Sequence, residues 1–164
     1  MNAYKAVVTK KDVRAFTDQP IDDESLRKIL QGGRMAGSAK ATEPCRFVVI
    51  KDEDTKKRLA ATGAYAGWIV NAPVVLAVVL EGGRQFDAGR AVQNMLIVAN
   101  SLEIGSCPVT VGEEAGIVLG VPETHAVAAV IAFGHEAPGA AESSRRKQPR
   151  RPFEEYVHWE RWGG

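Results

Sequence analysis

The sequence has 164 residues, and this length predicts a single folded domain over residues 1–164. Hydrophobic residues make up 45% and charged residues 25%, a composition that excludes disorder for the chain as a whole. The longest apolar runs, at 72–80 and 126–133, have about half of the roughly 18 residues that a membrane span requires. No apolar core of signal-peptide length begins the chain. We therefore expect a cytoplasmic protein with no membrane partner.

The near-neutral net charge of +1 hides one cationic strip, RRKQPRR, at residues 145–151. Outside its five basic residues, the remaining 16 are outnumbered by 20 acidic ones. Such a strip suits nucleic acid, a membrane surface or a phosphorylated small molecule, and it is equally compatible with a solvated tail. Because the net charge is small and no aromatic residue interrupts the strip, we expect no nucleic-acid partner.

The cysteines and histidines predict no metal site. Cys45 and Cys107 are far apart, neither belongs to a CxxC motif, and the three histidines form no HExxH arrangement. A P-loop, a GxGxxG turn and a GxSxG elbow are also missing from the sequence. Cys45 lies between a proline and an apolar run, so we expect it to be a packed thiol without a chemical role.

Hydrophobic periodicity predicts helices and strands that alternate along the chain. Strands are predicted at 46–51, 73–80, 106–111 and 126–133, and helices at 24–37, 53–62, 87–103 and 113–119. The run at 73–80 has the pattern of a strand that is buried on both faces. The fold class is therefore predicted to be mixed α and β, with a covered sheet.

Two of these helices carry specific expectations about which side chains are buried. Capping by Asp22 and Asp23 begins the first, whose core-facing residues are expected to be Leu26, Ile29, Leu30 and Met35. The helix at 53–62 is expected to expose Lys56, Lys57 and Arg58.

The end of the chain carries an unusual amount of aromatic surface. Four aromatic residues recur at three-residue steps and predict one amphipathic helical face: Phe153, Tyr156, Trp159 and Trp162. A chain end with this much apolar area is expected to dock. Docking on its own domain and docking on a second subunit both remain open.

A short basic segment lies near the start of the chain. Lys10, Lys11 and Arg14 fall within five residues and are interleaved with the apolar Val13 and Phe16. This pattern predicts a cationic segment that is anchored to the core. Its arginine would pair either with a phosphate, which suits the forked donors, or with one of the chain's carboxylates.

The order of five segments resembles the FMN-dependent nitroreductase family over nearly the whole chain. These segments are KKDVRAFTDQPI, SAKATEPCRFVVI, FDAGRAVQNMLIVANSLEIGSCPV, LGVPETHAVAAVIAFGHEA and RRPFEEYVHW. The resemblance implies an α+β, nitroreductase-like fold with a central, mostly antiparallel β-sheet covered by helices. It also implies a homodimer in which the C-terminal segment, from about residue 140, is exchanged with or docked on the partner.

The resemblance assigns FMN-binding roles to two basic segments. Lys10, Lys11 and Arg14 stand where the family contacts the flavin phosphate and ribityl chain. Asp12 replaces a frequent serine, so we expect it to orient a cation or to accept from a ribityl hydroxyl. The late basic segment is expected to close on the same phosphate with Lys147, Arg150 and Arg151.

Further residues of the site come from the segment that lies along the flavin and from a later turn. Ser38 matches the family serine, whereas Ala41 replaces the usual asparagine and Glu43 the glutamine; Lys40 could supply a charge there. The turn that follows the central helix is expected to aim a backbone N–H at flavin N5, and it contains Pro108, Val109 and Thr110. Tyr65 and Trp68 are expected to border the substrate pocket, although core packing is an equal alternative for Trp68.

The resemblance implies an FMN-dependent oxidoreductase that uses NADH or NADPH. Hydride would pass through flavin N5 to an electron-poor acceptor, such as a nitroaromatic or a quinone, in a ping-pong mechanism. No side chain is assigned as the catalyst, because the flavin carries the redox chemistry. The departures at Ala41 and Glu43 leave one alternative open, a flavin- or nucleotide-binding module without turnover, such as a sensor or carrier.

Overall fold

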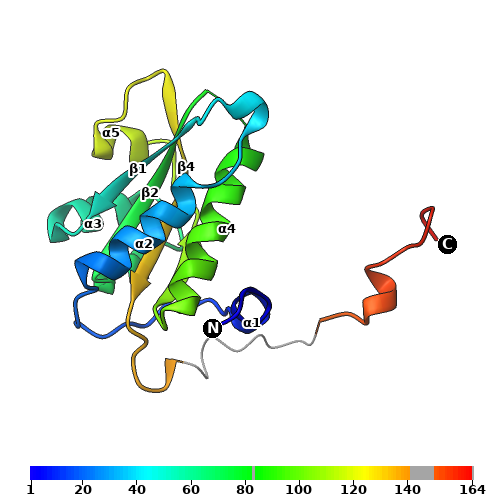
Figure 1. The fold of residues 1–164 in the computed structure, drawn as a ribbon. Coiled ribbons are helices and arrows are strands. Elements are labelled where there is room, and N and C mark those ends of the chain that lie inside the picture. Colours follow the sequence, from blue (N-terminus) through cyan, green and yellow to red (C-terminus); the bar gives the residue numbers. More distant parts are fainter. Residues whose placement is uncertain (83, 141–149, 164) are drawn as a thin grey trace.

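A four-stranded antiparallel sheet forms the centre of the computed structural model, which describes residues 1–82, 84–140 and 150–163 (Figure 1). Its strands lie in the order β1 (Cys45–Ile50), β2 (Val74–Glu81), β4 (His125–Gly134) and β3 (Gly105–Val109). Every neighbouring pair is antiparallel, with Val48 opposite Ala77 and Val130 opposite both Ala77 and Val109. The predicted covered, antiparallel sheet is confirmed.

Helices cover both faces of this sheet. One face packs against α2 (Asp23–Arg34) and α4 (Gln85–Ser101), and the other against α3 (Glu53–Ala61), η2 (Gly67–Asn71) and α5 (Ala115–Leu119). The remaining elements are α1 (Ala3–Thr9), which packs on α4, and the short turns η1 (Ala39–Ala41) and η3 (Phe153–Glu155). No helix formed by the described residues is both long and apolar enough to span a bilayer.

Strand β2 is buried on both faces, as its continuous apolar run predicts. Leu76 and Val78 belong to the core beneath α2 and α4, whereas Val75 and Ala77 belong to the core on the opposite face. Successive side chains of a strand point to opposite sides, so a central strand between two helical layers needs apolar residues at every position. This burial places β2 at the centre of both hydrophobic cores.

Helix ends follow the local signals in the sequence. The carboxylates of Asp22 and Asp52 each accept a hydrogen bond, at 2.8 Å, from the backbone N–H three residues later, at the starts of α2 and α3. Their hydrogen bonds with Ser25 and Thr55 lower the pKa of both aspartates. Helix α5 ends at Gly120, whose φ of 65° is a left-handed conformation that favours glycine.

Three local expectations prove wrong. Helix α1 was not predicted, because its two adjacent valines favour strands; the Asn2 side chain caps it by accepting from the N–H of Lys5. Met35 is 67% exposed, because α2 ends one residue earlier and Met35 forms its C-cap. Lys56 is buried instead of facing solvent, and its Nζ donates to the carbonyl oxygen of Ala72 at 2.9 Å.

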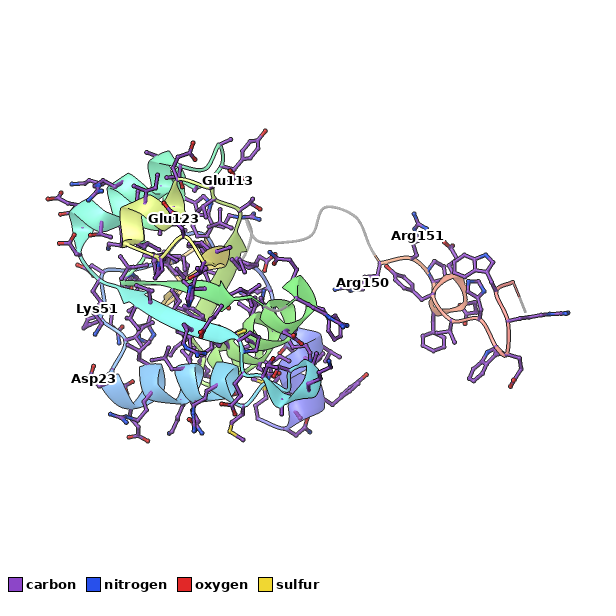
Figure 2. All side chains as sticks on the ribbon, turned by 90° about the horizontal axis from the view of Figure 1, so that it is seen from above. Asp23, Lys51, Glu113, Glu123, Arg150 and Arg151 are labelled. Atoms are coloured by element: carbon purple, nitrogen blue, oxygen red, sulfur yellow. The ribbon has the colours of Figure 1, made fainter. Side chains whose placement is uncertain are left out.

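The C-terminal segment does not form the predicted helical face. Only Phe153–Glu155 is helical, as a single 3-10 turn, and residues 150–163 lie apart from the body in both views (Figures 1 and 2). The four aromatic side chains therefore stay exposed, from 58% for Tyr156 to 90% for Trp162. Their three-residue spacing fits a 3-10 turn better than an α-helix, and long 3-10 runs are unfavourable.

Phe133, which is fully buried beside α2 and α4, allows a test of this core. We predict that Phe133→Ala lowers the free energy of unfolding by about 3–5 kcal/mol, because it removes a buried ring and leaves a cavity. Ile117→Ala is the control: its side chain is 80% exposed, and we expect a change within about 0.5 kcal/mol. Equilibrium urea denaturation measures both, and equal effects would contradict the assigned core.

Candidate functional site

The N-terminal basic segment is anchored along the outer edge of β3. Asp12 forms an isolated parallel bridge with Ser106, and the N–H of Val13 donates to the carbonyl oxygen of Ser106 at 3.1 Å. The Val13 side chain is only 1% exposed, and Phe16 bridges Glu136 on the segment that follows β4. These contacts hold the backbone of residues 10–14 in place while Lys11, Asp12 and Arg14 reach solvent.

Two of the three cations in this segment are held by carboxylates. Lys10 pairs with Asp12, and Lys11 Nζ lies 2.8 Å from the Oε1 atom of Glu136. Asp12 therefore orients a cation, in line with one of the two roles expected for it. Arg14 forms no ion pair with a carboxylate among the described residues, and it hydrogen-bonds the Cys107 thiol. The cluster keeps a charge of +1, and Arg14 is the cation that remains available to an anion.

The other residues assigned near this segment lie on β3 and η2. Pro108 and Thr110 are exposed, and Val109 is half-buried. The ring centroid of Trp68 is 6.4 Å from that of Phe16, and Trp68 packs against the core on the α3 face, in agreement with its core-packing alternative. Tyr65 is 87% exposed.

Residues 38–43 form a separate loop with an unusual backbone. The φ angles of Lys40, Ala41 and Glu43 are 56°, 53° and 48°, a left-handed conformation that costs energy for residues with a side chain. Two hydrogen bonds hold the loop: Ser38 Oγ accepts from the N–H of Glu43 at 2.9 Å, and Asp87 Oδ1 accepts from the N–H of Ala39 at 3.3 Å. Strained loops of this kind are frequent at binding sites.

Helix α4 separates the two groups of assigned residues. At its C-terminal end, Asn100 Nδ2 donates to Ala6 O and Thr9 Oγ1, beside residues 10–14. At its N-terminal end, Asp87 holds the loop of residues 38–43. A helix of 17 residues is about 25 Å long, so one chain does not bring the two groups together (Figure 1).

The late basic segment does not reach residues 10–14 within one chain. Arg150 and Arg151 are exposed and lie outside the body (Figure 2). Residues 150–163 hydrogen-bond only among themselves within the described part of the chain. Lys147 lies outside the described residues. The convergence of two basic segments of one chain on one phosphate is therefore not present in this conformation.

A cavity of about 760 Å³, which the sequence did not predict, lies between α2 and the edge strand β1. Leu26, Leu30 and Phe47 contribute apolar walls. Asp87 also lines it; this residue is 97% buried, and its Oδ2 atom has no hydrogen-bond partner among the described residues. Neither Tyr65 nor Trp68 lines the cavity. A buried carboxylate oxygen without a partner is costly, which indicates that a donor covers it in the assembled protein.

Cys45 lines the same cavity, and its thiol is held in the protonated form. Burial raises its pKa above the ordinary value, the charge of Asp87 raises it further, and Arg46 opposes both. Arg46 Nη2 is itself engaged with Glu81 Oε2 at 2.6 Å. A thiol in this setting is a weak nucleophile, which supports a packing role for Cys45.

The chain matches the model described as the nitroreductase family over residues 7–62 and 61–135. It is 27% identical to a proposed NADH dehydrogenase/NAD(P)H nitroreductase of Archaeoglobus fulgidus, over 96% of this chain and 97% of that protein. It is 24% identical to the FMN reductase [NAD(P)H] of Bacillus subtilis, over 95% and 72% of the two chains. The crystal structure of a proposed nitroreductase of Desulfovibrio desulfuricans, in complex with FMN, superimposes with a TM-score of 0.83 at 29% identity, covering 99% and 98%.

The raised pKa of Cys45 gives a pH-dependent prediction. Because the thiolate is disfavoured, alkylation of Cys45 by iodoacetamide should be slow at pH 7 and should keep accelerating beyond pH 9. Mass spectrometry after timed quenching measures the rate at each pH. The Cys45→Ser variant reports the background from Cys107, which is also buried with a raised pKa. A Cys45 rate that is already maximal at pH 7 would show a thiolate and contradict the packing role.

Proposed function

Because the chain belongs to the nitroreductase family, we propose that it is an FMN-dependent oxidoreductase that carries reducing equivalents from NADH or NADPH to an electron-poor acceptor. The FMN reductase relative and the FMN-bound neighbour support the cofactor, and a nitroaromatic or a quinone fits the acceptor class. The observation within this chain that carries the proposal is the unpaired cation of Arg14 on an anchored, net-positive segment.

The residues of this segment suit a phosphate-bearing cofactor. Arg14 has planar, forked donors that match phosphate oxygens, and Lys10 and Lys11 are kept nearby by Asp12 and Glu136. Because these cations are already positioned, little reorganisation is needed when an anion binds. Bound FMN would supply the two-electron chemistry that links donor and acceptor. The chain's own part is to bind, orient and shield the reactants.

The overall reaction requires no catalytic acid or base from the chain. For a quinone acceptor, NAD(P)H loses a hydride to become NAD(P)⁺, and the quinone gains two electrons and two protons to become a hydroquinone. The second proton comes from water. We propose that donor and acceptor use the same pocket in turn.

A two-fold dimer would complete the cofactor site. An isologous pairing of α4 places the N-terminal end of one helix beside the C-terminal end of the other, so residues 38–43 of one copy meet residues 10–14 of its partner. The outer face of α4 leaves room for this contact, because Gln93 is exposed and no atom lies within 4 Å of a Cβ position at Gly89. The proposal therefore includes a homodimer with two composite sites.

The same dimer gives the C-terminal segment a place to dock. We propose that its aromatic side chains fill the cavity between α2 and β1 of the second copy. The apolar walls suit Phe153 and Trp159, and the unpartnered Oδ2 of Asp87 suits an arginine of the segment, which carries Arg150, Arg151 and Arg161. Edge strand β1 also offers unpaired backbone groups on that side. Docking would bring the late basic residues to the partner.

Purified protein loaded with FMN tests the function directly. We expect NADH or NADPH to bleach the flavin absorption anaerobically, and a quinone or nitroaromatic to restore it and to sustain steady-state NAD(P)H oxidation. The comparison of the two donors identifies the preferred one. FMN binding without bleaching by either donor would favour the alternative of a binding module without turnover.

Charge reversal at Arg14 tests the phosphate site. We predict that Arg14→Glu raises the Kd for FMN at least about tenfold, because an attraction at a charged hydrogen bond becomes a repulsion. Lys57→Glu is a matched control, since it makes the same charge change on the exposed face of α3, where Lys57 pairs with Glu53. Fluorescence titration of FMN measures both. An unchanged Kd for folded Arg14→Glu would remove Arg14 from the site.

Removal of residues 153–164 tests the docked tail. We predict that this truncated chain becomes monomeric or aggregates and binds FMN more weakly, because the partner's groove is uncovered. Leu30→Asp, which changes the groove and keeps the tail, should weaken the dimer in the same way. Multi-angle light scattering gives the molar mass. A truncated chain that stays dimeric and retains FMN would show that the tail has no part in the dimer.

A further inference from the structure

The first two turns of α4 expose an aromatic ring and a cation side by side. Phe86 is 73% exposed, and the guanidinium carbon of Arg90 lies 5.9 Å from the centroid of its ring. The two residues are four positions apart on the helix, so their side chains share one face. Neither residue is among those assigned to the cofactor, and neither lines the cavity between α2 and β1.

This pair is held against the loop that contains residues 38–43. A Cβ atom at Gly37 would lie 2.6 Å from Nη2 of Arg90, so the guanidinium rests on the backbone immediately before Ser38. The hydrogen bond from the N–H of Ala39 to Asp87 fixes the same loop to the same helical turn. Arg90 forms no ion pair with a carboxylate within the described residues, so its charge is free for a ligand.

We infer that Phe86 and Arg90 form a subsite for a planar, anionic electron acceptor. The acceptor's ring would stack on Phe86, and its carboxylate or sulfonate would take the forked donors of Arg90. This inference rests on the proposed function, in which residues 38–43 border the bound flavin. The acceptor would then lie at the edge of that half of the site, with its negative charge on Arg90.

The phosphate of NADPH presents the same chemistry to an arginine, but the position of Arg90 favours the acceptor. That phosphate lies at the adenosine end of the donor, far from the nicotinamide ring that reacts. Arg90, in contrast, contacts Gly37, which is adjacent in sequence to Ser38. A group bound there is close to the reacting centre, where the acceptor must sit.

Paired quinones test the inference on the full-length, FMN-loaded protein. The acceptors are 1,4-naphthoquinone-2-sulfonate and the neutral 2-methyl-1,4-naphthoquinone, which share one ring system and differ in charge. We expect Arg90→Gln to lower the ratio of kcat/KM for the anionic acceptor to that for the neutral one by about tenfold, mainly through KM. Phe86→Leu should lower kcat/KM for both acceptors, because both stack.

Arg58→Gln is the matched control, since it removes one positive charge from the exposed surface of α3. It should leave the ratio unchanged, and a fall equal to that of Arg90→Gln would show a general effect of net charge. Each variant is also measured with NADH and with NADPH. A change confined to the NADPH reaction would assign Arg90 to the donor and overturn the inference.

Calorimetric binding of naphthalene-2-sulfonate, which has no quinone to reduce, gives a readout that does not depend on turnover. We expect Arg90→Gln to weaken this binding about tenfold and Arg58→Gln to leave it unchanged. If neither quinone is reduced by the wild-type protein, the proposed function fails and binding alone decides the subsite. If both are reduced and neither the ratio nor the binding changes in Arg90→Gln, the proposed function stands and the subsite is wrong.

Discussion

The packing of α4 along the sheet is the constraint on which both halves of the candidate site depend. Met95 and Ala99 are fully buried against the sheet, so the helix has one possible position and direction. Each end then holds one half-site: Asn100 binds the residues just before Lys10, and Asp87 binds the loop after Ser38. A rigid helix of 17 residues cannot bend to bring its ends together, which is the physical reason for a site shared between two copies.

The loop of residues 38–43 shows how the site can tolerate unusual side chains. Ala41 and Glu43 depart from the family's asparagine and glutamine, yet both adopt left-handed φ angles. The hydrogen bonds of Ser38 and Asp87 impose this conformation. Asparagine adopts such angles more readily than alanine, so the departure at Ala41 costs backbone strain as well as a polar side chain. The loop shape is therefore specified by its neighbours, and the departures bear on which substrate binds.

Two features that are unfavourable in one chain are complementary in a pair. The C-terminal segment exposes four aromatic rings, and the cavity beside β1 exposes apolar walls and an unpartnered carboxylate oxygen. Apolar surface in water costs free energy in proportion to its area, and a buried polar atom without a partner adds a further cost. An intersubunit contact would remove both costs together. The same contact would bring Arg150 and Arg151 onto a neighbouring body, where a phosphate site could use them.

The sequence by itself determined the local elements and the order of the motifs. Alternation and periodicity are local properties, so β2, α4 and the caps at Asp22 and Asp52 could be predicted, and so could the anchoring of Val13. Only the tertiary structure decided that Lys56 is buried on the carbonyl of Ala72, because that carbonyl comes from a distant segment. It also decided that the residues assigned to one cofactor lie at opposite ends of a helix. Sequence spacing carries no information about distances across a fold, since these depend on how the helices pack on the sheet.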